Sequence, residues 1–351
     1  MDADRIPGGL GQRIVQLHPT LRCNLVCRHC YSTSGPDNRV SLAPDVLLGV
    51  LEDAAAMGYE VVSVSGGEPF LYPGLVKLLA HARSLGLRTT VTTNGTVLSP
   101  RRLAGIRDHL DLLAVSVDGP PGLHDRIRGA GSFDRMTEGL DRLRAASVPF
   151  GLICTVTRRS WTELVWLGRF AAEQQARLLQ LHPLELTGRA ERELAMDAPG
   201  DDVSARTYLM ATALAAEYRG RLRVQVDLLP TEDLRQFPEL VYASDLESSA
   251  IATSRPAELL SPIVVEADGT VVPVSYGFAR SYRVGHVGGR GLAAAWPGYL
   301  EERYPAFRRL CRGLWEGISK GDRAVVNWHE LIVECSNASA ADREFQGCSA
   351  C

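Results

Sequence analysis

The sequence predicts an α/β fold in which six strand–helix units form an open barrel, followed by a smaller and less regular α+β module. Three observations support this prediction. Strand-like and helix-like stretches alternate over the first 188 residues, as in parallel β-sheets. A cysteine cluster and several glycine-containing turns come directly after predicted strands. Beyond residue 188 the alternation gives way to polar loops, one helix and a hairpin signal.

Hydrophobic patterns and turn residues define the elements of the barrel. Strands are expected over residues 14–17, 61–65, 87–93, 112–117, 150–156 and 178–181. Helices are expected over residues 41–57, 73–85, from 99 onward, 132–146 and 160–174. Ser41 is the expected N-cap of the first helix and Gly58 its stop. Parallel α/β sheets bind ligands at the carboxyl ends of their strands, so we expect the functional site at that edge.

Changes in composition divide the chain into three parts. We expect a barrel core over residues 1–188, a linker and helical extension over 189–260, and a separate C-terminal domain over 261–351. The elements expected in the second part are a helix over 203–218, a short strand over 224–228 and an irregular stretch over 244–256. The third part opens with the turn Asp268-Gly269 between two β-rich runs, which is a strong hairpin signal.

Charge and hydropathy exclude several classes of protein. The chain has 38 basic and 41 acidic residues, a net charge of −3, so it is not a globally basic nucleic-acid binder. No apolar run approaches the length of a transmembrane helix, and the first 13 residues lack the apolar segment of a signal peptide. We therefore expect a cytoplasmic protein, in which eight cysteines indicate metal or redox chemistry more than disulfides.

Three cysteines form the pattern C-x3-C-x2-C: Cys23, Cys27 and Cys30. Three thiolates on one short loop can ligate three irons of a cubane cluster, whose usual complement is four cysteines. A missing fourth protein ligand leaves one iron open to a substrate, as in catalytic zinc sites. The alternative is a zinc site with a distant fourth ligand. His29, between two of the cysteines, is then either a ligand or a packing residue.

This triplet closely resembles the C-x3-C-x-Φ-C signature of the radical S-adenosylmethionine (radical SAM) superfamily, with His29 at the position that is usually aromatic. The resemblance implies a partial (β/α)6 TIM-like barrel. It also implies a [4Fe–4S] cluster on Cys23, Cys27 and Cys30, with S-adenosylmethionine (SAM) chelating the open iron. One-electron reduction then cleaves SAM and releases a 5′-deoxyadenosyl radical, which abstracts hydrogen from a substrate.

The turn after the second strand resembles the GGE motif of this family. It reads Gly66-Gly67-Glu68-Pro69, and adjacent glycines let the backbone approach a ligand closely. The resemblance implies that Glu68 binds the amino group of SAM, with Gly66, Gly67 and Pro69 around it. The alternative is a plain strand-to-turn transition. Asn94, in a turn that resembles the family's TNG motif, either touches the cofactor or makes the turn.

A third motif resembles the SxDG…HDxxRG…GSF pattern of the subfamily whose barrel precedes a SPASM or Twitch domain. The residues that carry it here include Ser116, Asp118 and Arg128. The resemblance implies that Ser116 lies near the ribose or carboxylate of SAM and that Arg128 contacts the carboxylate in bidentate fashion. The alternatives are a turn role for Asp118 and a surface charge for Arg128.

The C-terminal part resembles a SPASM domain that has lost most of its metal ligands. Val274 stands where the hairpin should present a cysteine, and Cys348 and Cys351 resemble a later C-x2-C pair after which the chain stops. With Cys311 and Cys335, these two can form one further cluster or a zinc site, or be ordinary cysteines. We expect the module to shape the substrate side of the barrel without carrying two additional clusters.

Three further residues, in or after predicted strands, are candidates for other roles. Cys154 lies within a predicted strand, and we interpret it as a core residue; the alternative is a thiol that donates a hydrogen atom to a product radical. His182 and Arg189, at the end of the sixth strand, are candidates for substrate contact by their position.

Peptide maturation is the most common substrate theme among the enzymes that this chain resembles. Only 22 residues precede Cys23, fewer than a winged-helix leader-binding domain needs, so a separate leader-recognition protein or a small-molecule substrate (sugar, nucleoside or tetrapyrrole) stays open. The family implies an external reductant of the flavodoxin or ferredoxin type. We expect neither nucleic acid nor membrane as a partner. The alternative of another class is a non-enzymatic metal-binding scaffold.

Overall fold

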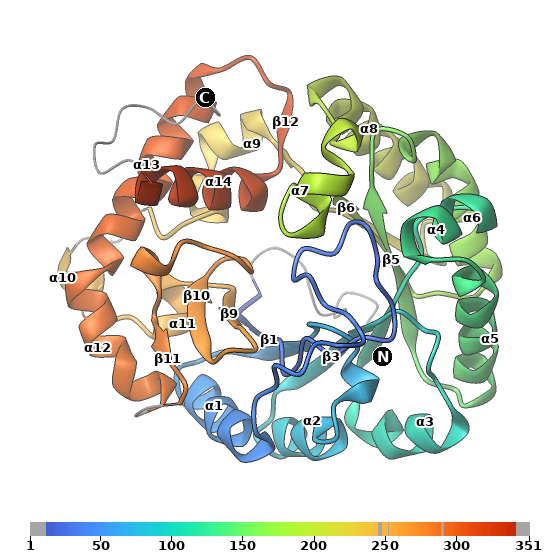
Figure 1. Ribbon diagram of the computed structural model, residues 1–351. Coiled ribbons are helices and arrows are strands. Elements are labelled where there is room, and N and C mark those ends of the chain that lie inside the picture. The colour runs from blue at the N-terminus through green and yellow to red at the C-terminus, as the bar shows by residue number, and fades with distance from the viewer. Residues whose placement is uncertain (1–11, 245–247, 252, 289–290, 342–351) are drawn as a thin grey trace.

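A computed structural model describes residues 12–244, 248–251, 253–288 and 291–341. Its main feature is a curved sheet of ten strands in the order β11-β10-β9-β1-β2-β3-β4-β5-β6-β7 (Figure 1). The strands are β1 Ile14–Leu17, β2 Val61–Val64, β3 Arg88–Thr93, β4 Leu112–Ser116, β5 Phe150–Val156, β6 Leu178–Pro183, β7 Arg223–Val226, β9 Ile263–Val265, β10 Thr270–Pro273 and β11 Gly285–His286. A second, antiparallel pair consists of β8 Leu229–Pro230 and β12 Val325–Val326.

The first seven strands pair in parallel in chain order, which confirms the partial barrel. Helices cover the outer face of the sheet, where Figure 1 shows them surrounding the strands. The helices of the described residues are α1 Pro44–Ala56, α2 Leu75–Ser84, α3 Pro100–Ile106, α4 Pro121–Arg128, α5 Ser132–Ala145, α6 Leu164–Glu173, α7 Arg189–Glu193, α8 Asp201–Glu217, α9 Thr231–Gln236, α10 Ser248–Ile251, α11 Pro256–Leu259, α12 Leu292–Glu302, α13 Tyr304–Lys320 and α14 Trp328–Ala341. Of these, α4, α7 and α14 contribute residues to the cavity described below.

Several element boundaries differ from the sequence-based expectation for local reasons. The first helix begins at Pro44 with Ala43 as its N-cap, because Ser41 donates a hydrogen bond to the carbonyl of Pro19 instead (3.1 Å). Helix α4 was not expected, since two prolines and a glycine at its start indicate a turn; proline is nevertheless well tolerated in a first helical turn. Helix α10 lies within the stretch expected to be irregular.

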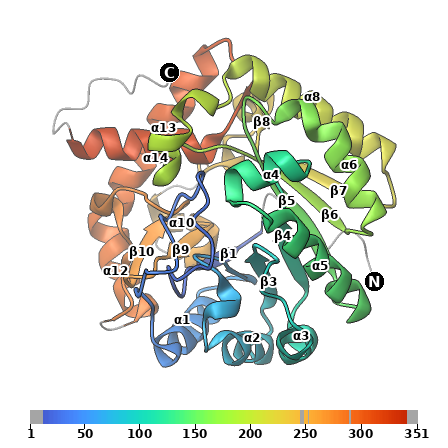
Figure 2. The same cartoon turned by 45° about the vertical axis from the view of Figure 1, so that its right-hand side comes forward.

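The sheet continues across both predicted domain boundaries. Strand β7 lies beyond residue 188, in the predicted linker, yet pairs in parallel with β6 from Leu178 opposite Arg223. Strand β9 lies beyond residue 260 and pairs in parallel with β1, with Val15 opposite Ile263. Figure 2 shows β9 and β10 beside β1 from a second direction. The hairpin around Asp268-Gly269 is thus present and extends the barrel sheet at the edge of β1.

The hydrophobic core lies between the sheet and its helices and is continuous into the C-terminal part. Helix α13 shows how the sequence achieves this. Its buried side chains recur every three or four residues: Tyr304, Phe307, Leu310, Cys311, Leu314 and Ile318. Full burial of one such large apolar side chain contributes about 1.5–3 kcal/mol. Within the described ranges, no helix combines the length and the hydropathy that crossing a membrane would require.

Candidate functional site

A cavity of about 780 Å³ runs through the barrel. Its wall extends from residues at the amino ends of the strands, such as Ile14 and Leu112, to the loops that follow their carboxyl ends. Alternate strand residues face it, for example Thr90 and Thr92 of β3. The loop that carries the three clustered cysteines closes one side, and residues 274–276 after β10 contribute to the wall. This volume lies within the usual range of small-molecule and cofactor sites.

The cysteine loop alternates between the cavity and solvent. Cys23 and Cys27 are buried, whereas the intervening Val26 is 57 % exposed, and all three cysteines line the cavity. Arg189 holds this loop from α7: its Nε donates to the carbonyl of Cys27 (2.8 Å), and its backbone N donates to the carbonyl of Cys30 (3.0 Å). Arg189 also lines the cavity, but its guanidinium is committed to backbone carbonyls and serves as a clamp on the loop.

The donor set fits an iron–sulfur cluster, in which three thiolates bind three separate irons. All three cysteines line the cavity. Burial raises the pKa of Cys23 to about 12, and it also raises the pKa of Cys27. A bound metal favours the thiolate form of such thiols.

The glycine pair is required by close backbone packing. At Gly66, φ is +105° and a Cβ would lie 2.7 Å from the carbonyl oxygen of Thr20. At Gly67, a Cβ would lie 2.2 Å from the carbonyl oxygen of Arg22. Both glycines line the cavity beside the cysteine loop. Because these two residues have no side chain, their backbone can contact the cysteine loop and border the cavity at the same time.

The side chain of Glu68 is bound by the turn after β3 and is not part of the cavity wall, and its contact with an amino group stays a prediction. It is fully buried, and the cavity wall does not include it. Its carboxylate accepts hydrogen bonds from the backbone N of Phe70 (3.1 Å), Thr93 Oγ1 (2.8 Å) and the backbone N of Asn94 (2.9 Å). Pro69 is also buried and begins a short 3₁₀ turn, Pro69–Leu71, outside the cavity wall. The carboxylate therefore joins the ends of β2 and β3.

Asn94 and Ser116 are the cavity residues of the second and third sequence motifs, and their contact with SAM stays a prediction. Both line the cavity, at the ends of β3 and β4. The Asn94 side chain donates to Asn24 Oδ1 (3.0 Å) and lies 3.8 Å from Cys23 Sγ. The turn after β3 is therefore attached directly to the cysteine loop.

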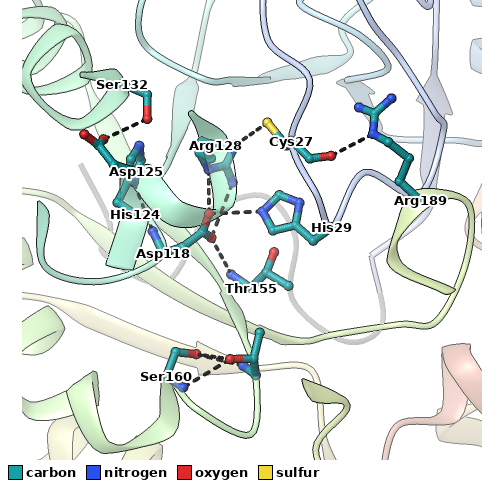
Figure 3. A network of polar contacts seen from close by, with 11 residues as sticks. Cys27, His29, Asp118, His124, Asp125, Arg128, Ser132, Thr155, Ser160 and Arg189 are labelled. Carbon is teal, nitrogen blue, oxygen red and sulfur yellow. Dashed lines mark hydrogen bonds and ion pairs between the residues drawn. The ribbon is translucent and has the colours of Figure 1, made fainter. Parts of the chain in front are cut away.

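Asp118 is the centre of a buried polar network that attaches the cysteine loop to β4, β5 and α4 (Figure 3). It accepts hydrogen bonds from Arg128 Nε (2.6 Å) and the backbone N of Thr155 (3.2 Å), and it pairs with His29 Nε2 (3.0 Å). Burial opposes a charge here, but Arg128 and His29 hold the pKa of Asp118 well below its usual range. Asp118 is therefore more than a turn residue, and His29 is engaged by a carboxylate.

Arg128 differs from both expectations. Only 8 % of it is exposed, so it is not a surface charge. It reaches the cavity wall, but its fork is occupied by Asp118, with Nε and Nη2 on the two carboxylate oxygens. The predicted bidentate contact with the carboxylate of SAM would compete with this ion pair. The remaining Nη1 lies 4.0 Å from Cys27 Sγ.

Cys154 belongs to the core, as expected from its place in β5. Its neighbours Ile153 and Thr155 line the cavity, whereas Cys154 is 2 % exposed and packs among the core side chains. Burial raises its pKa well above the usual value. The alternative of a hydrogen-atom donor in the cavity does not agree with this orientation.

Another part of the cavity wall, the His182 wall, contains a charged network of His182, Glu185 and Asp227, of which the sequence indicated only His182. His182 lines the cavity as predicted, with Nδ1 2.9 Å from Asp227 and Nε2 3.4 Å from Glu185. Burial opposes protonation, but the two carboxylates raise the pKa of His182 to about 9. Asp227 directly follows β7, so the strand-end rule would have indicated it had that strand been placed in the barrel.

The C-terminal part contributes aromatic side chains to the cavity. Tyr276 lines it, stacks on His18 with ring centroids 4.9 Å apart, and meets Tyr31 of the cysteine loop edge-on. Val274, at the position of the missing cysteine ligand, has φ +63°, an unusual conformation for a β-branched residue.

Two of the four late cysteines lie in the described part of the chain. Cys311 is a free thiol, fully buried in α13, and Cys335 is buried in α14. Both lie among the core side chains. Cys348 and Cys351 lie outside the described residues.

Comparisons with known proteins agree with this geometry. Residues 17–170 match the radical SAM superfamily. The chain is 26% identical over 323 residues to the Fe-coproporphyrin III synthase of Methanosarcina barkeri, covering 86% of this chain and 79% of that one. It is 30% identical over 226 residues to the PqqA peptide cyclase of Ruegeria pomeroyi, covering 63% and 59%. The chain spans about half the length of most curated relatives it matches.

The fold is similar to that of solved radical SAM enzymes. SuiB of Streptococcus suis bound to S-adenosylmethionine superposes with a TM-score of 0.66 at 16% identity, covering 89% of this chain and 72% of that one. Since the similarity extends well beyond residue 170, it includes the C-terminal part as well as the barrel.

Proposed function

Because this chain belongs to the radical SAM superfamily through residues 17–170, we propose that it is a radical SAM enzyme. Its substrate binds between the cysteine loop and the His182 wall. One observation carries the proposal: the three cysteines line the same cavity as Gly66, Gly67, Asn94 and Ser116. When bound, the family's [4Fe–4S] cluster and SAM supply a 5′-deoxyadenosyl radical that abstracts hydrogen from an unactivated carbon.

The chain's own residues would bind the cluster, leave room for SAM beside it and shield the cavity from water. Cys23, Cys27 and Cys30 would hold the cluster, and the bare backbone of Gly66 and Gly67 leaves room for SAM beside it. The C-terminal part covers the cavity with Tyr276 and Trp328. A covered site excludes water, which protects reactive species from side reactions.

A peptide is the substrate class that the cavity wall favours. A tetrapyrrole presents several carboxylates, which call for free cationic side chains. Arg128 and Arg189, beside the cysteine loop, are committed to Asp118 and to backbone carbonyls. The third arginine of the cavity wall, Arg223, begins β7 and so lies at the other end of the barrel. The His182 wall holds two carboxylates for one imidazolium. We therefore propose peptide maturation, with a separate leader-recognition protein and a flavodoxin- or ferredoxin-type reductant as partners.

A small molecule, including a tetrapyrrole, is the second candidate. One specific observation favours it: the match to a protein named Fe-coproporphyrin III synthase covers 86% of this chain. Offering the reconstituted protein a coproporphyrin and candidate precursor peptides in parallel separates the two classes. Deuterium transfer from the substrate into 5′-deoxyadenosine identifies the true one.

Anaerobic reconstitution tests the proposed activity. We expect about four irons per chain, a brown colour, and reductive cleavage of SAM to 5′-deoxyadenosine. The variant in which Cys23, Cys27 and Cys30 are alanine should lose all three. Cys154→Ala removes a thiol that faces the core and should keep the cluster. A colourless zinc protein, or cleavage by the triple variant at the wild-type rate, would contradict the proposal.

Iron content also tests the C-terminal part. Because Cys311 is buried in the core, we propose that this part carries no second cluster. About four irons with a single Mössbauer component agrees with this. About eight would mean that the late cysteines bind one further cluster.

A further inference from the structure

The sulfur atoms of the three clustered cysteines have different hydrogen-bond donors. Near Cys23 Sγ lie the backbone N of Leu25 (3.5 Å) and the side chain of Asn94 (3.8 Å). Cys30 Sγ accepts from the backbone N of Ser34 (3.3 Å). All of these donors are neutral. Near Cys27 Sγ lies Nη1 of Arg128, at 4.0 Å. Of the three sulfur atoms, this one therefore has a positively charged donor.

We propose that Arg128 is a positioning residue that makes the cluster easier to reduce, through its charged N–H···S contact with Cys27. The inference rests on the proposed function, because it requires a [4Fe–4S] cluster on the three cysteines. The step concerned is the transfer of one electron from the external reductant to the oxidised cluster, with no bond formed or broken. That electron adds a negative charge, which a nearby guanidinium stabilises. Net charge and hydrogen bonds to sulfur are established determinants of cluster potential.

The geometry explains how Arg128 keeps this position. Asp118 holds Nε (2.6 Å) and Nη2 (3.4 Å), which leaves Nη1 directed at the sulfur (Figure 3). Asp118 is itself fixed by the backbone N of Thr155 (3.2 Å). Both members of the ion pair are buried, Asp118 completely, so water screens the charges little.

His29 completes the link from the network to the loop. It lies between Cys27 and Cys30 in the sequence, and its Nε2 is 3.0 Å from Asp118 Oδ2. The cysteine loop is thus attached to the Asp118–Arg128 pair at two points, through His29 and through Cys27. A residue of this kind acts on the cluster through Cys27 and does not need to touch the substrate.

The test is a potentiometric titration of the reconstituted full chain without SAM, in which electron paramagnetic resonance measures the fraction of reduced cluster. Arg128→Gln should move the midpoint potential to a more negative value, by about a tenfold change in the reduction equilibrium constant, as expected for loss of a charge-assisted hydrogen bond. For one electron, a tenfold change is 59 mV. Arg128→Lys retains the charge and should move the potential less. Arg126→Gln, an exposed arginine of the same helix, should leave it unchanged.

A double variant keeps the test decisive if Arg128→Gln fails to fold because Asp118 is left unpaired. Asp118→Asn combined with Arg128→Gln removes both charges, and it should still shift the potential negatively because the guanidinium lies nearer the sulfur. Resonance Raman bands of the Fe–S(Cys) stretch should shift in the same variants. An intact cluster with an unchanged midpoint potential would overturn this inference alone. If those variants in addition bind SAM more weakly, Arg128 contacts the carboxylate of SAM instead. A wild-type chain that assembles no four-iron cluster would overturn the proposed function itself.

Discussion

The carboxylate of Glu68 ties together the ends of two strands that carry the site. It accepts three hydrogen bonds, two of them from Thr93 and Asn94 at the end of β3. Burial raises the pKa of Glu68, while these donors lower it. Asn94 in turn contacts the cysteine loop. A residue that never reaches the cavity can therefore determine where cavity residues lie.

Glu68→Gln should destabilise the fold. The amide replaces one acceptor oxygen by an NH2 group that faces a buried donor, and an unsatisfied buried polar group costs about 1–3 kcal/mol. Urea unfolding of the apo-protein measures the loss. Glu60→Gln is the matched control: this glutamate is half exposed, and surface ion pairs of this kind contribute little. Unchanged stability together with weakened SAM binding would support the amino-group contact that the motif suggests.

The sequence motifs predicted which loops border the cavity, but not the directions of their side chains. Cys23, Cys27, Asn94 and Ser116 all line the cavity, because spacing and strand-end position fix which loops meet there. Glu68 lies in the motif yet turns inward. Whether a carboxylate faces a ligand or a neighbouring strand depends on donors from elsewhere in the chain, which no local pattern contains.

At the scale of elements, helix α5 packs directly on the turn after β3. A Cβ built on Gly139 of α5 would lie 2.2 Å from the carbonyl oxygen of Gly95. This turn carries Asn94, so the position of the helix constrains the loop beside the cysteines. A glycine within a helix usually costs stability, and here close packing provides the reason for it.

Gly139→Ala should therefore destabilise the protein. Alanine would gain about 1 kcal/mol in helix propensity, but forcing a methyl group into packed backbone typically costs about 1–3 kcal/mol or more. Gly49→Ala in α1 is the control, because nothing lies within 4 Å of its Cβ position. That variant should be more stable than the wild type. If both variants gain stability in denaturant unfolding, the close approach between α5 and the turn is not real.

The His182 wall predicts a pH-dependent stability. The pKa of His182 is about 9 in the folded protein and 6.5 in an unfolded reference, because Glu185 and Asp227 favour its charge despite burial. The stabilisation is complete below pH 6.5 and is lost as the pH rises to about 9. Glu330, whose pKa burial and neighbouring carboxylates raise to about 8, adds a slope of the same sign.

His182→Gln isolates this contribution. The decrease in unfolding free energy between pH 6.5 and 9 should be steeper in the wild type than in the variant. His81→Gln is the control: His81 lies on α2, in a surface pair with Glu52 of α1, and the variant should retain the wild-type slope. Parallel pH profiles for the wild type and His182→Gln would show that the imidazolium is not stabilised by these carboxylates.

At the scale of the whole molecule, one sheet joins parts that composition separates. The alternation of strands and helices predicted the barrel, since that pattern is local. The pairing of β9 with β1 joins residues about 250 positions apart, and no short-range signal encodes it. The hairpin itself was predictable from Asp268-Gly269, whereas its place at the β1 edge was not. The site is thus enclosed by parts from both ends of the chain.

This continuity predicts that the described parts unfold as one unit. Separate domains would give separate transitions, whereas a shared sheet and core couple them. Far-UV circular dichroism reports the whole chain. Tryptophan fluorescence of a Trp161→Phe/Trp166→Phe variant reports Trp296, Trp315 and Trp328 in the C-terminal part. The two urea transitions should coincide in that variant.

Ile263→Val, in the buried strand β9, should lower the free energy of unfolding by about 0.5–1.5 kcal/mol. The midpoints of both transitions should therefore move to lower urea concentration by the same amount. Two resolved transitions, or a shift confined to the fluorescence signal, would mean that the hairpin joins the barrel edge without coupling the stability of the two parts.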